Sequence, residues 1–160
     1  MVHGDDDGLR LPPKIASAHV VLLPIIHKEE SRAEVLSFCH KLAQGLNAMR
    51  YREGPLIAIV DERDVRGGEK TWSWIKKGIP IRIEIGPRDM EGDRFPIYRR
   101  DLPHREAKVF SRAEILSHIH EELDGIQANL FQQAVAFREA HIKKFLNMLM
   151  KKRQTSTTTT

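Results

Sequence analysis

The chain has 160 residues, which is about the size of one domain. Hydrophobic residues make up 41% and charged residues 30%, a composition that excludes a disordered or collagen-like chain. The formal net charge of +4 permits an anionic partner but does not prove one. With a single cysteine, Cys39, the chain forms no internal disulfide and has no cysteine cluster for structural zinc.

The N-terminal part shows no sign of a targeting or membrane-spanning segment. Residues 1–7 are acidic and have no apolar core, unlike a secretory signal. Residues 20–26 are the longest apolar run of the first half, far below the ~20 residues that span a bilayer. Small secreted domains usually depend on disulfides. We therefore expect a cytoplasmic protein in which residues 1–18 form a linker or the end of a preceding domain.

The first half of the chain predicts a strand, a helix and a second strand. Residues 19–26 and 56–60 are short apolar runs rich in β-branched residues, typical of strands buried on both faces. Between them, Ser31 and Glu34 have the spacing of a capping box that opens a helix. An apolar face follows at helical spacing, and it includes Cys39. We expect this thiol to be a buried hydrophobic group rather than a reactive one.

The middle of the chain predicts a short helix followed by a three-stranded meander. Residues 69–77 form a helix that Gly78 closes. In residues 79–85 every second residue is isoleucine, which predicts a strand with an isoleucine core face and a polar outer face. Residues 86–93 are expected to turn the chain, and residues 94–100 and 105–110 are expected to form two further strands.

The last predicted element is a long helix. Ser111 and Glu114 have the spacing of a second capping box, and apolar residues recur from Ile115 to Phe137 at helical spacing. This helix should reach Lys151 or Lys152, with a bend at Gly125, before a disordered tail at residues 153–160. The expected fold class is α/β: one domain over residues 19–152, with a mixed, roughly five-stranded sheet flanked by three helices, the last of them long.

Several chemical signatures are weak or missing. The run from Gly67 to Thr71 superficially resembles a phosphate loop but lacks its order and spacing. His118 and His120 are two residues apart on a helix, so they cannot share a metal ion. Asp61, Glu62 and Asp64 could bind a metal, but a solvated turn is the favoured interpretation. We expect no catalytic residue and no metal site.

Positive charge is concentrated in the strand-rich middle. Residues 63–112 contain thirteen basic and eight acidic side chains, a balance of +5. Arg82 lies on the polar face of a predicted strand, and Arg88 lies in the turn after it; a guanidinium can donate two hydrogen bonds to guanine. Together with Trp72 and Trp74 these arginines suit the unstacked bases of single-stranded RNA. The alternative is a solvated face beside tryptophans of the core, and pattern alone leaves both open.

Several sequence segments resemble one known family, the prolyl-tRNA synthetases of the archaeal and eukaryotic type, in the region just after the catalytic core. The resemblance extends roughly over residues 1–142, and its most specific part is the run from Lys77 to Asp89. The other matching segments are His3–Asp6, Gly8–Ala16, Val20–Ile25, Asp61–Asp64, Glu69–Lys70, Trp74, Leu130–Phe131 and Ala136–Glu139.

The resemblance implies an anticodon-binding domain that reads the two guanines of the proline anticodon. In the family, an arginine at position 82 and a basic residue at position 88 contact these bases, and a basic residue after the next strand, here Arg105, assists. The family has a glutamate after the tryptophan matched by Trp74, whose carboxylate can accept hydrogen bonds from guanine. This sequence has Ile75 there, which has no such acceptor.

The resemblance also implies a partner and an activity for the full family enzyme. That enzyme is a ligase that activates proline with ATP and Mg²⁺ and esterifies tRNA. The three catalytic motifs of the family are not found in this sequence, so we expect the chain alone to be inactive and to need no cofactor. Its expected role is proline tRNA binding, with a catalytic domain or a dimer partner in the parent enzyme. The alternative is a degenerate free-standing relative that acts as a protein-interaction module without RNA binding.

Overall fold

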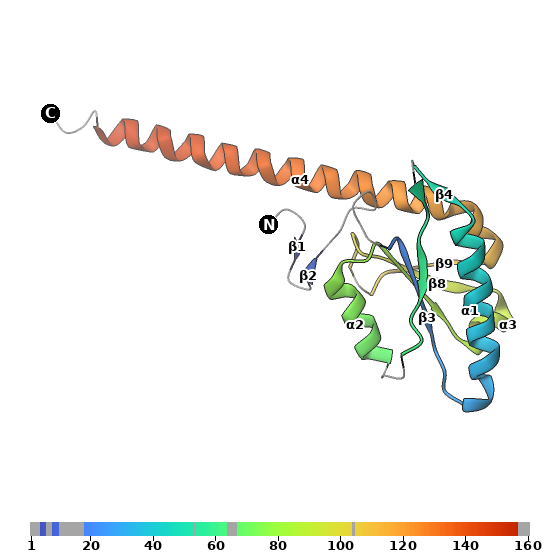
Figure 1. Ribbon diagram of the computed structural model, residues 1–160. Coiled ribbons are helices and arrows are strands. Elements are labelled where there is room, and N and C mark those ends of the chain that lie inside the picture. The colour runs from blue at the N-terminus through green and yellow to red at the C-terminus, as the bar shows by residue number, and fades with distance from the viewer. Residues whose placement is uncertain are drawn as a thin grey trace.

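The computed structural model describes residues 4–5, 8–9, 18–52, 54–63, 67–103 and 105–156 (Figure 1). Its main sheet consists of β3 (Val20–Pro24), β6 (Ala58–Val60), β7 (Ile81–Ile85), β8 (Phe95–Arg99) and β9 (Ala107–Phe110). The helical elements are the 3₁₀ turn η1 (Glu29–Ser31), α1 (Arg32–Asn47), α2 (Gly67–Lys77), α3 (Pro87–Gly92) and α4 (Arg112–Ser156). Two minor strand pairs join β1 (Gly4–Asp5) to β2 (Gly8–Leu9) and β4 (Arg50–Tyr51) to β5 (Gly54–Pro55).

The main sheet is mixed, as the order of predicted elements implied. Its strand order is β6-β3-β7-β8-β9. β3 pairs in parallel with both β6 and β7, whereas β7, β8 and β9 form an antiparallel meander. Parallel neighbours need a crossover, which α1 and α2 supply, and antiparallel neighbours are joined by short connections. The expectation of an α/β fold with one mixed five-stranded sheet is confirmed.

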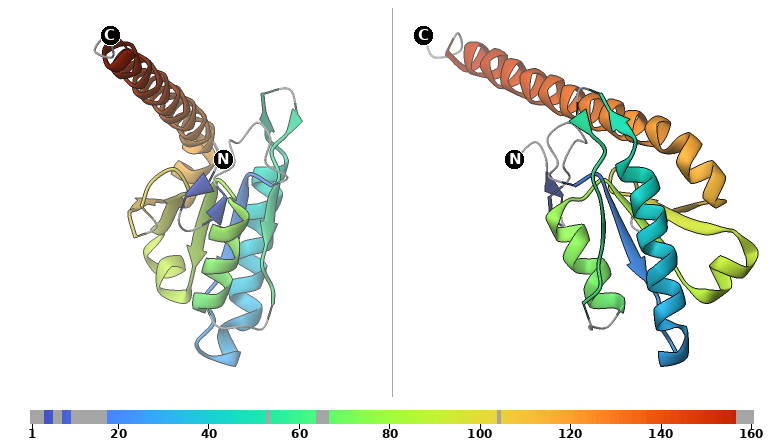
Figure 2. Two further views of the ribbon diagram at one scale, coloured as in Figure 1. Left: turned by 90° about the vertical axis from the view of Figure 1, so that its left-hand side faces the viewer. Right: turned by 45° about the vertical axis from the view of Figure 1, so that its right-hand side comes forward.

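The two faces of this sheet are covered differently. Helices α1 and the first part of α4 pack on one face, which we term the closed face, and α2 lies on the other (Figure 2). Because strand residues alternate between faces, Ile81, Ile83 and Ile85 of β7 point to the closed face. Arg82 and Glu84 therefore point to the side of α2, which packs against β3.

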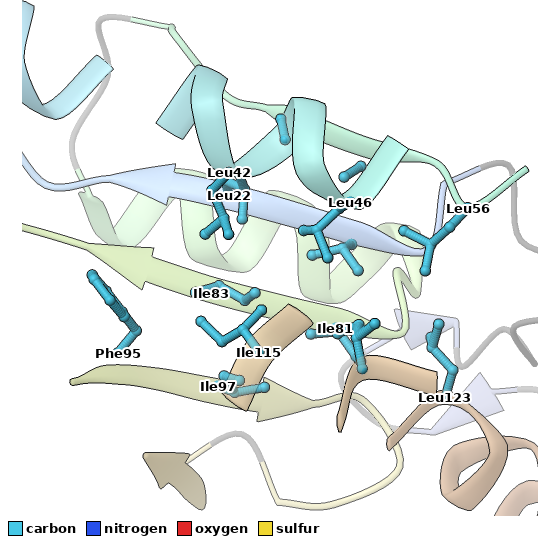
Figure 3. Close-up of a cluster of buried hydrophobic side chains, with 14 of the residues drawn as sticks. Leu22, Leu42, Leu46, Leu56, Ile81, Ile83, Phe95, Ile97, Ile115 and Leu123 are labelled. Atoms are coloured by element: carbon cyan, nitrogen blue, oxygen red, sulfur yellow. The ribbon is translucent and has the colours of Figure 1, made fainter. Parts of the chain in front are cut away.

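The closed face holds the main hydrophobic core. Leu22 of β3 and Ile83 of β7 lie against Leu42 of α1 and Ile115 of α4, and all four are completely buried (Figure 3). Cys39 belongs to the same cluster, and burial raises the pKa of its thiol to about 12, so it is a buried hydrophobic group as expected. The core thus contains the apolar faces of α1 and α4, which the helical spacing of apolar residues predicted.

The second cluster of buried side chains lies beneath α2. It joins Val21 and Leu23 of β3 to Ile79, with Trp74 of α2 packed against it. Ile79 was expected to share a face with the isoleucines of β7, and this expectation is wrong. β7 begins only at Ile81, so Ile79 stands in the connection from α2 and its side chain turns to the opposite side of the sheet.

The start of one helix agrees with the prediction from the sequence, and the starts of two others differ from it. Ser111 caps α4: its Oγ accepts a hydrogen bond from the Glu114 amide at 3.2 Å. Ser31 makes no such bond; its hydroxyl instead donates to the Lys28 carbonyl at 2.8 Å. The expected turn at residues 86–93 contains the helix α3, which starts with proline. The amide of the preceding residue, Gly86, donates to the Asp89 carboxylate at 3.0 Å.

Helix α4 is longer than the sequence predicted. It continues to Ser156, so residues 153–156 are helical rather than part of a disordered tail, and residues 157–160 lie outside the described residues. Its second half extends past the sheet (Figure 1). Gly125 allows a close approach: a Cβ there would stand 3.2 Å from the Arg99 guanidinium. The expected linker, residues 1–18, falls mostly outside the described residues.

Candidate nucleic-acid interface

One part of the sheet lies opposite the main core and carries charged and aromatic side chains. It is the α2 side of β7, β8 and β9, which we term the open face and define by Arg82, Glu84, Pro96, Tyr98 and Val109. Arg82 is directly opposite Tyr98 in the antiparallel register, and Pro96 is opposite Val109. Val109 is 52% exposed. The alternation that fills the core with isoleucines thus places a charged and aromatic group on the other side.

Arg82 and Tyr98 form a stacked pair on this face. The guanidinium carbon of Arg82 lies 4.9 Å from the centre of the Tyr98 ring, a cation–π arrangement. Arg82 is only 2% exposed, and its burial lowers the pKa of the guanidinium, while the negative charge of Glu84 acts in the opposite direction. The sequence predicted an outward-facing arginine, and the structure has Arg82 on that face but buried. A base would first meet the half-exposed Tyr98 ring.

Glu84 is the acidic member of the open face. It lies two residues after Arg82 on the same side of β7 and is half-buried. Burial raises the pKa of its carboxyl group; the positive Arg82 lowers this pKa, and the negative Asp89 raises it further. The pKa of the Tyr98 phenol is raised as well, first by burial and then by the negative charge of Glu84. Positive, negative and aromatic groups therefore lie within one small area.

Arg88 and Arg105 lie at opposite ends of β7. Arg88 is exposed in the first turn of α3, just after β7 ends, beside an open cavity of about 670 Å³ that Ile25, His27 and Lys28 also line. Arg105 is exposed in the connection from β8 to β9, which the antiparallel register places near the start of β7. A strand of five residues is about 13 Å long. Arg82, Arg88 and Arg105 therefore follow one line along the sheet but do not meet.

Ile75 lies on the buried side of α2 and is not exposed to solvent. Its side chain is 1% exposed, and its carbonyl accepts a hydrogen bond from Arg100 Nε at 2.9 Å. Position 75, where the resemblance expects a glutamate, is thus filled by an apolar side chain in a dry environment. A carboxylate placed here without any change of backbone would be desolvated, at a cost that favours its neutral form.

The two tryptophans of α2 differ in exposure. Trp72 is 41% exposed, so it can offer a ring to an unstacked base. Trp74 is anchored: its indole Nε1 donates to Asp61 at 2.7 Å, and the Lys77 ammonium lies 4.6 Å from the centre of its ring. Only the first of the pair has the exposure that base stacking needs.

Asp61 is a structural group and not part of a solvated turn, so that interpretation is wrong for this residue. It is 4% exposed and accepts two side-chain hydrogen bonds from Arg63, at 2.9 and 2.8 Å, besides that from Trp74. The Arg63 guanidinium holds the pKa of this carboxyl well below its usual range. Glu62 contacts His40 instead, and Asp64 lies outside the described residues. Among the described residues, no cluster of three potential ligands could hold a metal ion.

Sequence reasoning missed two members of the open face, Tyr98 and Glu84. The period of two in residues 79–85 already placed Glu84 beside Arg82, but a glutamate among basic residues looks like ordinary surface charge. Tyr98 could not be found locally, since its position over Arg82 follows from the register between β7 and β8. Arg99, its neighbour on the closed side, is a structural cation that pairs with Asp101 at 2.6 Å and with Glu122 at 3.1 Å.

Comparison with known proteins gives a consistent result. A family model described as an anticodon binding domain matches residues 19–122. Over 143 residues the chain is 45% identical to a proline--tRNA ligase of Akkermansia muciniphila and 42% identical to one of Thermococcus kodakarensis; each match covers 89% of this chain and 28% of the relative. A chloroplastic/mitochondrial proline--tRNA ligase of Arabidopsis thaliana is 40% identical over 147 residues, covering 89% of this chain and 26% of the relative.

The matches cover only part of each relative. The chain spans between a quarter and a third of the length of the curated relatives it matches. The part covered by the family model, residues 19–122, contains the whole main sheet, the open face, the helices α1, α2 and α3, and the first part of α4. Within the described residues no helix has the length and apolar character needed to cross a membrane.

Proposed function

Because the chain belongs to the anticodon-binding domain family, we propose that it binds the anticodon of a transfer RNA on the open face. Its relatives of known name are proline--tRNA ligases, so proline tRNA is the partner we propose, and the guanines of its anticodon are the bases we propose it reads. In a longer enzyme the catalytic domain would be supplied by a segment this chain does not share. The cytoplasm, where transfer RNA is charged, is the proposed location.

The observation that carries this proposal is the contact between Arg82 and Tyr98 on the side of the sheet opposite the main core. Single-stranded RNA is recognised by stacking its splayed bases on aromatic rings and by hydrogen bonds to their edges. Tyr98 is half-buried and has the Arg82 guanidinium 4.9 Å from the centre of its ring, a contact that restricts the ring before RNA arrives. A platform that is already ordered loses little side-chain entropy on binding.

The exposed basic residues supply the remaining part of the proposed mechanism. Arg88 and Arg105 are exposed at the two ends of β7, where they would contact phosphates or base edges on either side of a stacked base. Arg88 and Arg105 keep the roles of anticodon-contacting residues that we proposed for them, and Arg82 acts from beneath Tyr98. Ile75 would contribute only through packing, because it is 1% exposed.

The alternative of a protein-interaction module without RNA binding is not favoured. Family membership points to an anticodon, and exposed arginines lie near the two ends of β7, a charge arrangement that suits a phosphate chain. The alternative predicts that the purified chain binds no RNA, so a binding titration distinguishes the two.

The test is a filter-binding titration of the purified chain with transcribed proline tRNA and with the same tRNA whose two anticodon guanines are changed to adenines. We expect the unaltered tRNA to bind at least about tenfold more tightly at one fixed salt concentration. Arg88→Ala and Arg105→Ala should weaken binding, whereas the matched change Arg138→Ala, at an exposed position of α4 away from the sheet, should not. Equal affinity for both RNAs would overturn the proposal.

A further inference from the structure

The Glu84 carboxylate is the acidic group of the open face, and no hydrogen bond or ion pair joins it to another described residue. It is nevertheless half-buried on β7. A carboxylate that loses water without gaining a partner costs free energy. Other buried or half-buried acidic groups of the chain are paired: Asp61 binds Arg63, and Asp101 and Glu122 bind Arg99. Glu84 is therefore an acceptor available to a ligand.

The surroundings of Glu84 define what such a ligand would meet. Arg82 lies on the same side of β7 two residues earlier, and Leu23 of β3 flanks it on the neighbouring strand. Tyr98 stands diagonally across on β8, opposite Arg82. Among the described residues, the charges that act on Glu84 are the Arg82 guanidinium and the Asp89 carboxylate, which is already bonded to the Gly86 amide at 3.0 Å. A flat ring stacked on Tyr98 would bring its edge toward the carboxylate.

We propose that Glu84 is a specificity-determining residue that selects guanine, by accepting hydrogen bonds from its N1–H and N2–H groups while the base stacks on Tyr98. This inference rests on the proposed function, since it assigns a base to the same surface. In the family resemblance the corresponding carboxylate follows Trp74 on the helix. Here that position is the buried Ile75, and Glu84 supplies the acceptor from the adjacent strand.

The chemistry favours guanine over the other three bases. An ionised carboxylate only accepts hydrogen bonds, and it can accept two that are side by side. Guanine alone has two adjacent donors, N1–H and N2–H, on its Watson–Crick edge. Adenine and cytosine each have one amino group beside a ring-nitrogen acceptor, and uracil has one N–H between two carbonyl oxygens, so each would direct an acceptor at Glu84.

The experiment compares two variants on three RNAs. The probes are a proline-type anticodon stem-loop and two versions in which one or the other anticodon guanine is replaced by inosine, which lacks only the N2 amino group. Glu84→Gln removes the charge and one acceptor while keeping the size of the side chain. The matched control is Glu91→Gln, which removes the same charge from an exposed position of α3, off the sheet.

With the unaltered chain, inosine at one of the two positions should weaken binding by about tenfold. In Glu84→Gln that penalty should fall to about twofold or less, and in Glu91→Gln it should stay near tenfold. A thermal melt of each variant establishes that it is folded, and Glu84→Asp, which keeps the charge on a shorter side chain, should retain part of the penalty.

The outcomes separate the two proposals. If the unaltered chain binds the guanine stem-loop no better than a stem-loop without guanines, anticodon binding itself is wrong. If it discriminates but Glu84→Gln keeps the full inosine penalty, the role of Glu84 is wrong and anticodon binding stands.

Discussion

The two sides of strand β7 show how one strand can serve stability and recognition at once. On the closed face, Ile81, Ile83 and Ile85 are completely buried beneath α1 and α4. On the open face, Arg82 is buried and Glu84 is half-buried, and both lie near Tyr98. The closed side consists of groups that gain by leaving water, whereas the open side holds charges that lose hydration. The comparison shows that the two sides of one strand contribute differently to folding, which fits the role in recognition that we propose for the open side.

The largest expected effect comes from truncating the closed face. Ile83→Ala should destabilise the chain by about 2–5 kcal/mol, because it removes buried methyl groups and leaves a cavity. Val109→Ala, at a 52% exposed position of the open face, is the control and should change stability by no more than about 0.5 kcal/mol. Urea denaturation of both variants measures the difference. Similar losses in the two would contradict the division into a closed and an open face.

The free energy of unfolding should depend on pH through Asp61, which joins the end of β6 to α2 through Trp74. Asp61→Asn should cost about 1–3 kcal/mol near pH 7, since it weakens the bonds from Arg63 and Trp74. The pKa of Asp61 is lowered in the folded state, so its stabilising effect is complete above the unfolded value of about 3.9 and fades as the pH falls below it. Urea denaturation at pH 7 and at pH 3 should therefore show a smaller gap between the Asp61→Asn variant and the wild type at pH 3; an unchanged gap would refute this role.

Recognition on the open face should depend on the shape of Arg82 as well as on its charge. Arg82→Ala should weaken binding of proline tRNA by about 1–3 kcal/mol and relax the preference at one anticodon position. Arg82→Lys keeps the charge but loses the flat surface that stacks on Tyr98, so it should recover only part of the affinity. Both are measured by titration after a melt confirms folding. Full recovery by lysine would mean that charge alone is needed.

The smallest expected effect is a gain in stability. The raised pKa of Glu84 means that the folded state loses stability as the pH rises from the unfolded value of about 4.3 through the folded value. Glu84→Gln should remove this loss and leave the chain equally stable or more stable, within about 0.5 kcal/mol, at pH 7. The readout is the urea midpoint at pH 7. A clear loss of stability would indicate that Glu84 holds the fold together after all.

The fold was largely predictable because its signals are local. The alternation in residues 79–85 and the apolar faces of α1 and α4 depend only on sequence spacing. The limit is seen in a repeated tetrapeptide: Ser-Arg-Ala-Glu occurs at residues 31–34 and 111–114, yet only Ser111 caps its helix. Ser31 belongs to the preceding 3₁₀ turn, which holds its backbone in a helical conformation (φ −89°, ψ −9°) and directs its hydroxyl to Lys28.

The candidate site was less predictable because its geometry is not local. The sequence indicated that Arg82 points away from the isoleucine core, and it does. That Tyr98 covers it depends on how β7 and β8 align, which the spacing within either strand does not determine. The same holds for Asp61, whose partner Trp74 comes from a helix that follows the strand, and for Ile75, whose burial depends on how α2 docks on the sheet.

The first part of α4 packs in the core and its second part is exposed, and this difference should affect how readily its backbone hydrogen bonds open. Its first part contributes Ile115, Ile119 and Leu123 to the core, whereas Phe137, Ile142 and Phe145 are each more than half exposed. A helix that packs on nothing relies on its own weak propagation, since isolated helices are marginal in water. In hydrogen–deuterium exchange of the isolated chain, amides before Leu130 should therefore exchange only with global unfolding, while those beyond Phe137 should exchange orders of magnitude faster. One continuous helix would thus contain two parts that differ in their protection from hydrogen exchange.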